Sequence, residues 1–112
     1  MKRIDAMIPS IRRNVVVDAI MKADAKGVTI AEARGKGAGE RPLVRGPRAA
    51  ARYVAEYNRT DCISVILEDS KVTEMVNAIM NAAHTGKPGD GKIFVSTVDE
   101  TYDVATKSKA SL

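Results

Sequence analysis

The stretch TGKPGDGKIFV, residues 85–95, combines glycine, charge and the start of an apolar segment. Three glycines lie within six residues, and Asp90 and Lys92 alternate with the last two, Gly89 and Gly91. Glycine lets successive backbone N–H groups converge on an anion, and a lysine adds a point charge. The pattern therefore indicates a phosphate-binding loop at the entrance of a strand. A plain turn, in which the Asp-Gly pair only supplies the required dihedral angles, stays open as the alternative.

A second segment with glycine and charge, RGKGAG at residues 34–39, stands at the end of a predicted strand. We expect it and the 85–95 loop to come from neighbouring strands, so that they meet within one chain or across a subunit interface. The segment also opens a basic region. From Arg34 to Arg59 there are seven basic and two acidic residues, whereas the net charge of the whole chain is +4. Such a region suits binding to phosphate groups or to an acidic protein surface.

Hydrophobic periodicity predicts six main elements in the order strand, helix, strand, strand, helix, strand. The predicted strands cover residues 3–9, 28–34, 62–67 and 92–98, with a further extended piece at 101–105. The first helix is expected to begin with Ser10 as its cap and to end at Gly27, and the second to begin with Asp69 or Ser70 as its cap. Apolar residues at helical spacing define the expected core face of each helix: Ile11, Val15, Ala19, Ile20 and Ala23 in the first, and Val72, Met75, Val76, Ile79 and Ala83 in the second.

This order repeats one strand–helix–strand unit twice, which predicts an α+β fold. The expected architecture is a ferredoxin-like βαββαβ sandwich whose antiparallel sheet carries both helices on one face. The length of 112 residues fits a single domain over residues 1–112. The two middle strands would form a hairpin, yet the connection between them, residues 35–59, is far longer than is usual in hairpins. We expect this basic connection to be flexible and functional, and residues 106–112 to form a polar tail.

Composition narrows the class of protein. Aromatic residues make up 4% of the chain and tryptophan is absent, so the core must be aliphatic. The single cysteine, Cys62, excludes an internal disulfide, and we expect it to be a small buried hydrophobe. No apolar run is long enough for a membrane helix and no signal peptide is recognised, which predicts a cytoplasmic protein. Met21, Met75 and Met80 are expected in the core, and His84 beside the carbonyl groups that end the second helix.

Two segments together resemble the PII nitrogen-regulatory signal-transduction family. The carboxy-terminal segment carries Thr85, the run GDGKIFV at 89–95 and an aliphatic Val98. The segment GVTIAEARGKG, residues 27–37, is similar to the second strand of the family. The resemblance covers nearly the whole chain and implies a ferredoxin-like homotrimer with ATP or ADP in clefts between subunits. The long connection would be the family's T-loop, which docks on targets such as an ammonium transporter or a nitrogen-metabolism enzyme.

The same resemblance implies which residues contact the nucleotide. Met7 and Ile66 would form apolar walls, while Lys92 would offset the phosphate charge. The implied contacts are Met7, Thr29, Gly35, Lys36, Gly37, Ala38, Ile66, Gly89, Asp90, Gly91 and Lys92. The family also implies Mg²⁺ and 2-oxoglutarate as co-ligands, and a modified tyrosine in the T-loop, for which Tyr53 is the candidate. A purely structural role, in which Tyr53 or Tyr57 packs on the base of the loop, stays open. No catalytic residue and no protein-built metal site are implied.

The sequence departs from the family pattern where these ligands would be held. A glutamine that helps to hold Mg²⁺ and 2-oxoglutarate is replaced by Gly39, and a lysine that pairs with 2-oxoglutarate by Thr60, or by Arg59 in another alignment. Two arginines that clamp the phosphates correspond to Asp103 and Ala105, and an aspartate repels a triphosphate. We therefore expect nucleotide to bind, but 2-oxoglutarate not to bind in the usual mode. Basic residues that could replace the arginines are Lys107, Lys109, Arg45 and Arg48.

Other functions remain open. A PII-like sensor of AMP, a cyclic nucleotide or bicarbonate would fit the missing glutamine and arginines. A nucleic-acid-binding module would use the basic connection, but such sheets present aromatic residues for base stacking, and only Phe94 and Tyr102 are candidates here. An enzyme is not expected, because the sequence offers no Ser/His/Asp or Cys/His set and has one histidine. We predict a cytoplasmic, trimeric regulator of nitrogen metabolism that reads adenine nucleotide.

Overall fold

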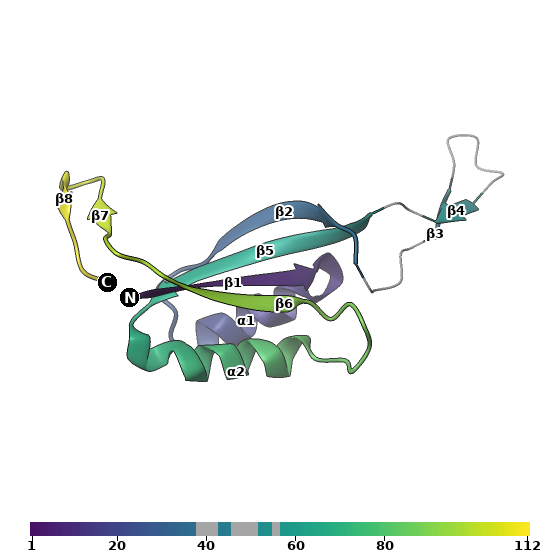
Figure 1. Cartoon of the computed structure of the whole chain (residues 1–112), viewed down its shortest axis with the longest axis horizontal. Coiled ribbons are helices and arrows are strands. Elements are labelled where there is room, and N and C mark those ends of the chain that lie inside the picture. Colours follow the sequence, from purple (N-terminus) through teal and green to yellow (C-terminus); the bar gives the residue numbers. More distant parts are fainter. Residues whose placement is uncertain (38–42, 46–51, 55–56) are drawn as a thin grey trace.

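The computed structural model describes residues 1–37, 43–45, 52–54 and 57–112 (Figure 1). Two of the residues named above as ligand positions, Ala38 and Gly39, lie outside these ranges, as does Arg48. The main elements are β1 (Lys2–Pro9), α1 (Arg13–Lys22), β2 (Thr29–Gly35), β5 (Asn58–Leu67), α2 (Val72–Ala83) and β6 (Lys92–Thr97). The short ones are the 3₁₀ turns Ser10–Arg12 and Asp69–Lys71 and the strands β3 (Leu43–Arg45), β4 (Arg52–Val54), β7 (Tyr102–Asp103) and β8 (Ser108–Lys109).

The four long strands form one antiparallel sheet in the order β2-β5-β1-β6. Both helices cover the same face of this sheet, which leaves the other face without a layer (Figure 1). The arrangement confirms the predicted α+β fold of the ferredoxin-like type. Strand β1 is central: Met7, for example, is paired with Cys62 of β5 on one side and with Lys92 of β6 on the other.

The core lies between the sheet and the two helices and is aliphatic. On β1, Ile4 and Ala6 are fully buried and Ile8 is nearly so, while the residues between them are not. This period of two is what a strand with one covered face requires. The buried apolar side chains are Ile4, Ala6, Ile8, Val16, Ile20, Ile63, Val65, Leu67, Met75, Ile79 and Ala83.

The predicted core face is right for α2 and only partly right for α1. In α2, Met75, Ile79 and Ala83 are buried, and Val72 and Val76 pack against them. In α1, Ile20 is buried and Ala23 packs against the core as expected, whereas Ile11 is 92% and Val15 is 44% exposed. Val16 is buried in place of Val15, and Ile11 lies in the 3₁₀ turn Ser10–Arg12, which precedes the α-helix.

The predicted helix boundaries also need correction. None of the predicted cap residues, Ser10, Asp69 and Ser70, caps a helix with its side chain. Asp69 instead accepts a hydrogen bond from the Met1 ammonium group at 2.6 Å. Helix α1 ends at Lys22, well before Gly27, because Asp24 adopts the left-handed conformation with φ of 65°.

Two of the three methionines expected in the core are not there. Met75 is buried, but Met21 and Met80 are each nearly half exposed in the single chain. Both lie on helix positions away from the sheet-facing stripe, which the spacing of Met75, Ile79 and Ala83 defines in α2. The exposed Met80 borders a groove between α2 and β6.

The connection between β2 and β5 spans residues 36–57, slightly less than the predicted 35–59, because Gly35, Asn58 and Arg59 belong to the sheet. Within it, β3 pairs with β4, a ladder that periodicity did not predict. The carboxy-terminal segment also differs from the predicted polar tail, since β7 pairs with β8 in a small hairpin apart from the main sheet. In Figure 1 this hairpin lies at the opposite end of the sheet from β3 and β4.

Shortening a core side chain tests this packing. We expect Ile63→Ala to lower the free energy of unfolding by about 2–5 kcal/mol, because Ile63 is fully buried and the truncation leaves a cavity. Ile11→Ala is the control, since Ile11 is 92% exposed, and should change it by less than about 0.5 kcal/mol. Urea denaturation followed by circular dichroism measures both. Equal losses in the two variants would contradict the assigned core.

Candidate functional site

The loop between α2 and β6 is organised around the carboxylate of Asp90. This carboxylate accepts hydrogen bonds from the backbone N–H of Thr85 at 2.7 Å, from the Thr85 hydroxyl, and from the backbone N–H of Gly86 at 2.9 Å. The two hydrogen bonds from Thr85 are the main cause that holds the pKa of Asp90 below its ordinary value. Desolvation opposes them, and the hydrogen bond from Gly86 lowers the pKa by a smaller amount. Asp90 therefore closes the loop on itself, which is the turn role left open by the sequence.

The side chain of His84 lies in the same loop and, contrary to expectation, does not contact the carbonyl groups that end α2. Its backbone N–H bonds to the Met80 carbonyl, but its ring lies on the loop side, with Nδ1 3.8 Å from a carboxylate oxygen of Asp90. The side chain is largely exposed. The expected contact of the His84 ring with the helix carbonyl groups is thus replaced by a contact with Asp90.

Gly91 brings the loop backbone against β1. It has φ of 118°, and a Cβ atom built there would lie 2.1 Å from the carbonyl oxygen of Met7. No residue with a side chain fits in that space, and L-residues rarely adopt this conformation. The next residue, Lys92, is exposed and starts β6 paired with Met7. The glycine thus allows a close backbone approach that places a cation at the end of the sheet.

Figure 1 shows that the described residues 34–37 of the first glycine segment and the loop at 85–92 lie at the same end of the sheet, where β2 ends and β6 begins. They are not on neighbouring strands, as we expected, because β2 and β6 are the two edges of the sheet. With strands about 4.8 Å apart, three spacings separate them by about 14 Å. Gly35 is nevertheless constrained within the chain, since a Cβ atom there would lie 2.9 Å from the Thr60 hydroxyl oxygen.

The other predicted contacts lie on the sheet face without helices. Alternation places Met7, Thr29 and Ile66 on this outer face, opposite to the buried residues of their strands. Ile66 pairs with Arg3, four residues before Met7 along β1, so the two expected apolar walls are about 13 Å apart. Thr29 starts β2, at the far end of that strand from Gly35. A single chain therefore holds the predicted residues in two groups and not in one pocket.

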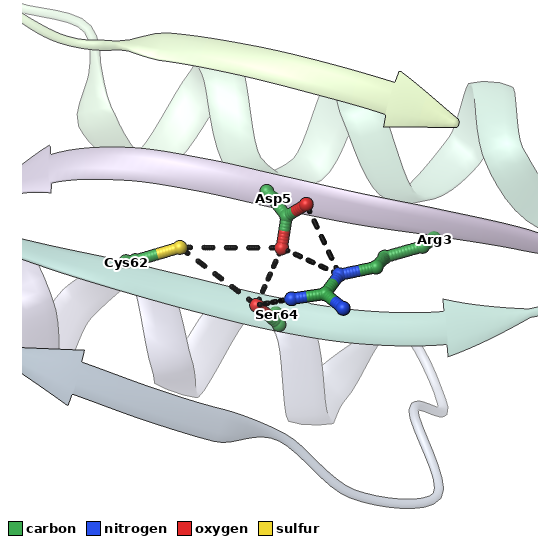
Figure 2. Close-up of polar contacts among 4 residues, drawn as sticks. All are labelled: Arg3, Asp5, Cys62 and Ser64. Atoms are coloured by element: carbon green, nitrogen blue, oxygen red, sulfur yellow. Dashed lines mark hydrogen bonds and ion pairs between the residues drawn. The ribbon is translucent and has the colours of Figure 1, made fainter.

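A polar network that the sequence analysis missed lies on this outer face between the two groups (Figure 2). Asp5 of β1 accepts a hydrogen bond from the Ser64 hydroxyl at 2.5 Å and from Arg3 Nε at 2.9 Å. Burial raises the pKa of Asp5, but the hydrogen bonds from Ser64 and Arg3 together lower it below its ordinary value. The carboxylate is therefore ionised on an otherwise open sheet face.

Cys62 is part of this network, which corrects its expected role as a buried hydrophobe. Its sulfur lies 3.9 Å from Asp5 and 3.8 Å from Ser64, on the outer face of β5 and only half buried (Figure 2). Period-two alternation could have found this, because Cys62 and Ser64 alternate with Ile63 and Val65, which are buried.

A groove of about 520 Å³ lies between α2 and the edge strand β6. Three predicted residues, Asp90, Gly91 and Lys92, line one end of it together with His84. Its size is in the range of small-molecule sites. Its apolar walls were not predicted: Ile8, Val76, Met80, Ala83, Ile93 and Val95.

The two positions that replace the phosphate-clamping arginines lie in the carboxy-terminal hairpin. Asp103 is in β7 and Ala105 in the turn that follows, so they do not form one alternating strand face. An oxygen of Asp103 accepts a hydrogen bond from the Ala105 N–H at 3.0 Å, which stabilises this turn. Tyr53 lies in β4, and the prediction for its side chain stays a prediction.

The helices in the described part of the chain are all too short or too polar to cross a membrane. The His, Cys, Asp and Glu side chains of the same described part form no group of three that could hold a metal ion.

The fold and the position of its loops define a small ferredoxin-like domain with glycine, charge and a long basic connection at one end of the sheet. The family model for nitrogen regulatory protein P-II matches residues 1–108. A nitrogen regulatory protein P-II of Azospirillum brasilense is 40% identical over 111 residues, 97% of this chain and 96% of the relative. That of Rhizobium meliloti is 38% identical, covering 95% of this chain and 93% of the relative.

The chain therefore belongs to the nitrogen regulatory protein P-II family. This confirms the resemblance stated from the two segments at 27–37 and 85–98. It also confirms the prediction that the chain is a signalling regulator of the nitrogen-regulation class and not an enzyme.

The close approach at Gly91 is open to test. We expect Gly91→Ala to lower the free energy of unfolding by more than about 1 kcal/mol, because its methyl group collides with the Met7 carbonyl and its φ is unfavourable for alanine. Gly27→Ala is the matched control, since a Cβ atom there meets no atom within 4 Å. Thermal unfolding compares the two. A Gly91→Ala variant as stable as Gly27→Ala would disprove the approach.

The role of Asp90 predicts a pH dependence. Because its pKa is lowered in the folded state, the ionised carboxylate stabilises the loop above the ordinary value of 3.8, and this contribution is lost as the pH falls through the lowered pKa. Thr85→Val removes the hydroxyl that is one of the strongest causes, so the pKa of Asp90 should rise. Carboxyl ¹³C NMR titration measures it, and an unchanged pKa in Thr85→Val would refute the assignment.

Proposed function

We propose that the protein is a cytoplasmic, trimeric regulator of nitrogen metabolism that binds ATP or ADP in clefts between its subunits. The observation that supports this best is the division of the predicted contacts. Met7, Gly35 and Lys92 lie at the loop end of the sheet, whereas Thr29 and Ile66 lie toward its other end. Two such half-sites make one cleft only when the loop end of one subunit meets the outer face of another.

The groups at the loop end fit the phosphates of a nucleotide. Gly91 leaves its backbone uncovered, and Lys92 supplies an exposed positive charge beside it. Both carboxylate oxygens of Asp90 already accept hydrogen bonds within the loop, so Asp90 would shape the phosphate site without contacting the ligand. The position of Asp103 adds no cation, so in this proposal Lys92 and Lys36 are the cations among the described predicted contacts.

Ligand binding would act on partners through the connection between β2 and β5. The residues that flank this connection, Gly35 and Asn58, pair with each other at the loop end of the sheet. A nucleotide that contacts Gly35 or Lys36 would bind some conformations of the connection more tightly than others. It would shift the population toward the conformations that it binds more tightly. The basic character of the segment suits an acidic surface on a target such as an ammonium transporter or a nitrogen-metabolism enzyme.

A PII-like sensor of another small metabolite is the second candidate. It is favoured by one observation: the hairpin that holds Asp103 and Ala105 places no arginine where the family would clamp phosphates. AMP, a cyclic nucleotide or bicarbonate carries less negative charge than ATP and needs fewer cations. Mg²⁺ and 2-oxoglutarate are kept as co-ligands to be tested, since Gly39 offers them no side-chain ligand.

Calorimetric titration with ATP, ADP, AMP and bicarbonate, each with and without Mg²⁺ and 2-oxoglutarate, tests the proposal. We expect ATP or ADP to bind, and Lys92→Ala to weaken binding by about tenfold or more, because a charged hydrogen bond to phosphate is lost. Lys71→Ala, which removes an exposed lysine from the far end of the sheet, should leave it unchanged. Binding of AMP or bicarbonate alone would favour the second candidate, and silence with ATP and ADP would refute the first.

Light scattering on the same samples examines the assembly. We expect a mass about three times that of one chain, because the proposed cleft needs two subunits and the family resemblance implies a closed trimer. A monomer that binds nucleotide as tightly as the wild type would contradict the cleft between subunits.

A further inference from the structure

Arg34 and Arg59 stand directly opposite each other where β2 and β5 leave the sheet. Both are exposed, and alternation with the buried residues Asp61 and Ile63 places them on the helix-side face of the strands. Like charges directly opposite in an antiparallel pair destabilise the pairing. In the described part of the chain, neither guanidinium has a carboxylate within ion-pair distance.

The nearby carboxylates are engaged by a third arginine. Arg13, from the first turn of α1, lies 3.6 Å from Asp61 and 3.7 Å from Glu32. Asp61 is fully buried, and neither of its oxygens has a hydrogen-bond partner among the described residues. Three arginines thus lie near two carboxylates. Because Arg13 contacts both carboxylates, the uncompensated positive charge is that of Arg34 and Arg59.

A small cavity of about 280 Å³ lies at this pair. This volume leaves room for a small anion or a single phosphate group. The residues that line it are mostly polar and include both arginines, two hydroxyl residues and one acidic residue: Ser10, Glu32, Ala33, Arg34, Arg59 and Thr60.

We propose that Arg34 and Arg59, with Ser10, form a binding site for a phosphate group on the helix-side face of the β2–β5 pair. Each guanidinium has a planar fork that matches two oxygens, and a phosphate offers three or more acceptors with a charge close to −2. A carboxylate offers two oxygens and one charge, which is too few to serve both forks and the hydroxyl. Arg34 and Arg59 lie on the opposite face from Met7, Thr29 and Ile66, which separates them from these predicted nucleotide contacts, while Ala33 and Thr60 of the cavity lining alternate to the outer face.

The position of the site gives it a consequence for the long connection. Strand pairing ends at Gly35 and Asn58, one residue beyond the arginine pair. A bound phosphate removes the repulsion between Arg34 and Arg59 and so holds the roots of the 36–57 connection together. Phosphate, free or as a phosphomonoester, therefore regulates how firmly this connection is anchored.

Titration with inorganic phosphate at constant ionic strength tests the site, with NMR of the arginine Nε–H groups as the readout. We expect saturable shifts of Arg34 and Arg59, and slower amide exchange at residues 33–35 and 58–60. Arg34→Gln and Arg59→Gln should each weaken binding by about tenfold. Lys71→Gln, which removes the same charge at an exposed site elsewhere, should not, and Lys92→Ala should retain phosphate binding at the pair.

Titration with further ligands distinguishes free phosphate from phosphomonoesters as the ligand of this site. Glycerol 3-phosphate binding more tightly than inorganic phosphate would assign the site to phosphomonoesters, and the reverse order would assign it to free phosphate. Either result supports the site. Shifts that grow linearly without saturation, that survive in both arginine variants, or that 2-oxoglutarate produces at lower concentration than phosphate would overturn it. Both arginine variants lose one of two repelling charges, so we expect them to fold and to melt higher than the wild type in phosphate-free buffer.

Discussion

Strand β1 is the constraint on which the rest of the structure depends, because it is paired along both edges while its alternate residues fill the core. Ile4, Ala6 and Ile8 must face the helices, and this fixes which residues of β5 and β6 lie beside them. A slip of one residue would turn these side chains to the open face and bury Asp5 or Met7 instead. The register in turn fixes the loop end of the sheet, since Met7 must then stand between Cys62 and Lys92.

Two adjacent residues of the loop between α2 and β6 meet opposite requirements, since one position must lack a side chain and the other must carry a carboxylate. Gly91 needs the absence of a side chain, because the Met7 carbonyl occupies that space. Asp90 needs its carboxylate, because three donors of the loop converge on it. The Asp-Gly pair is therefore structural in both residues, and the groups left for an anion are Lys92 and N–H groups not engaged by Asp90. Of the two roles that the sequence left open for Asp90, the structure shows the turn role, and the ligand site at this loop stays a prediction.

Much of the fold followed from the sequence because burial on one face imposes a period that can be read. The strands and the core face of α2 were predicted in this way, and the order of elements led to the ferredoxin-like topology. In α1 the core takes Val16 and not Val15, and a run of three valines at 15–17 has no periodicity that distinguishes them. The two glycine segments lie at opposite edges because a ferredoxin-like sheet has β2 and β6 as its edge strands, so the expectation of neighbouring strands was wrong although the topology was right. The contacts among Arg13, Glu32 and Asp61 join three elements, and only packing brings them together.

The outer face and the helix-side face of the β2–β5 pair share one end of strand pairing. Ligand binding on one face can therefore affect ligand binding on the other. On the outer face Gly35 packs closely against Thr60, while on the helix side Arg34 faces Arg59 one residue earlier. A ligand at the outer face and a phosphate at the arginine pair would both favour closed strand ends. If each ligand favours the same state, each must raise the affinity for the other by the same factor. The sheet itself, and not a chain of side chains, would then carry the coupling to the connection at 36–57.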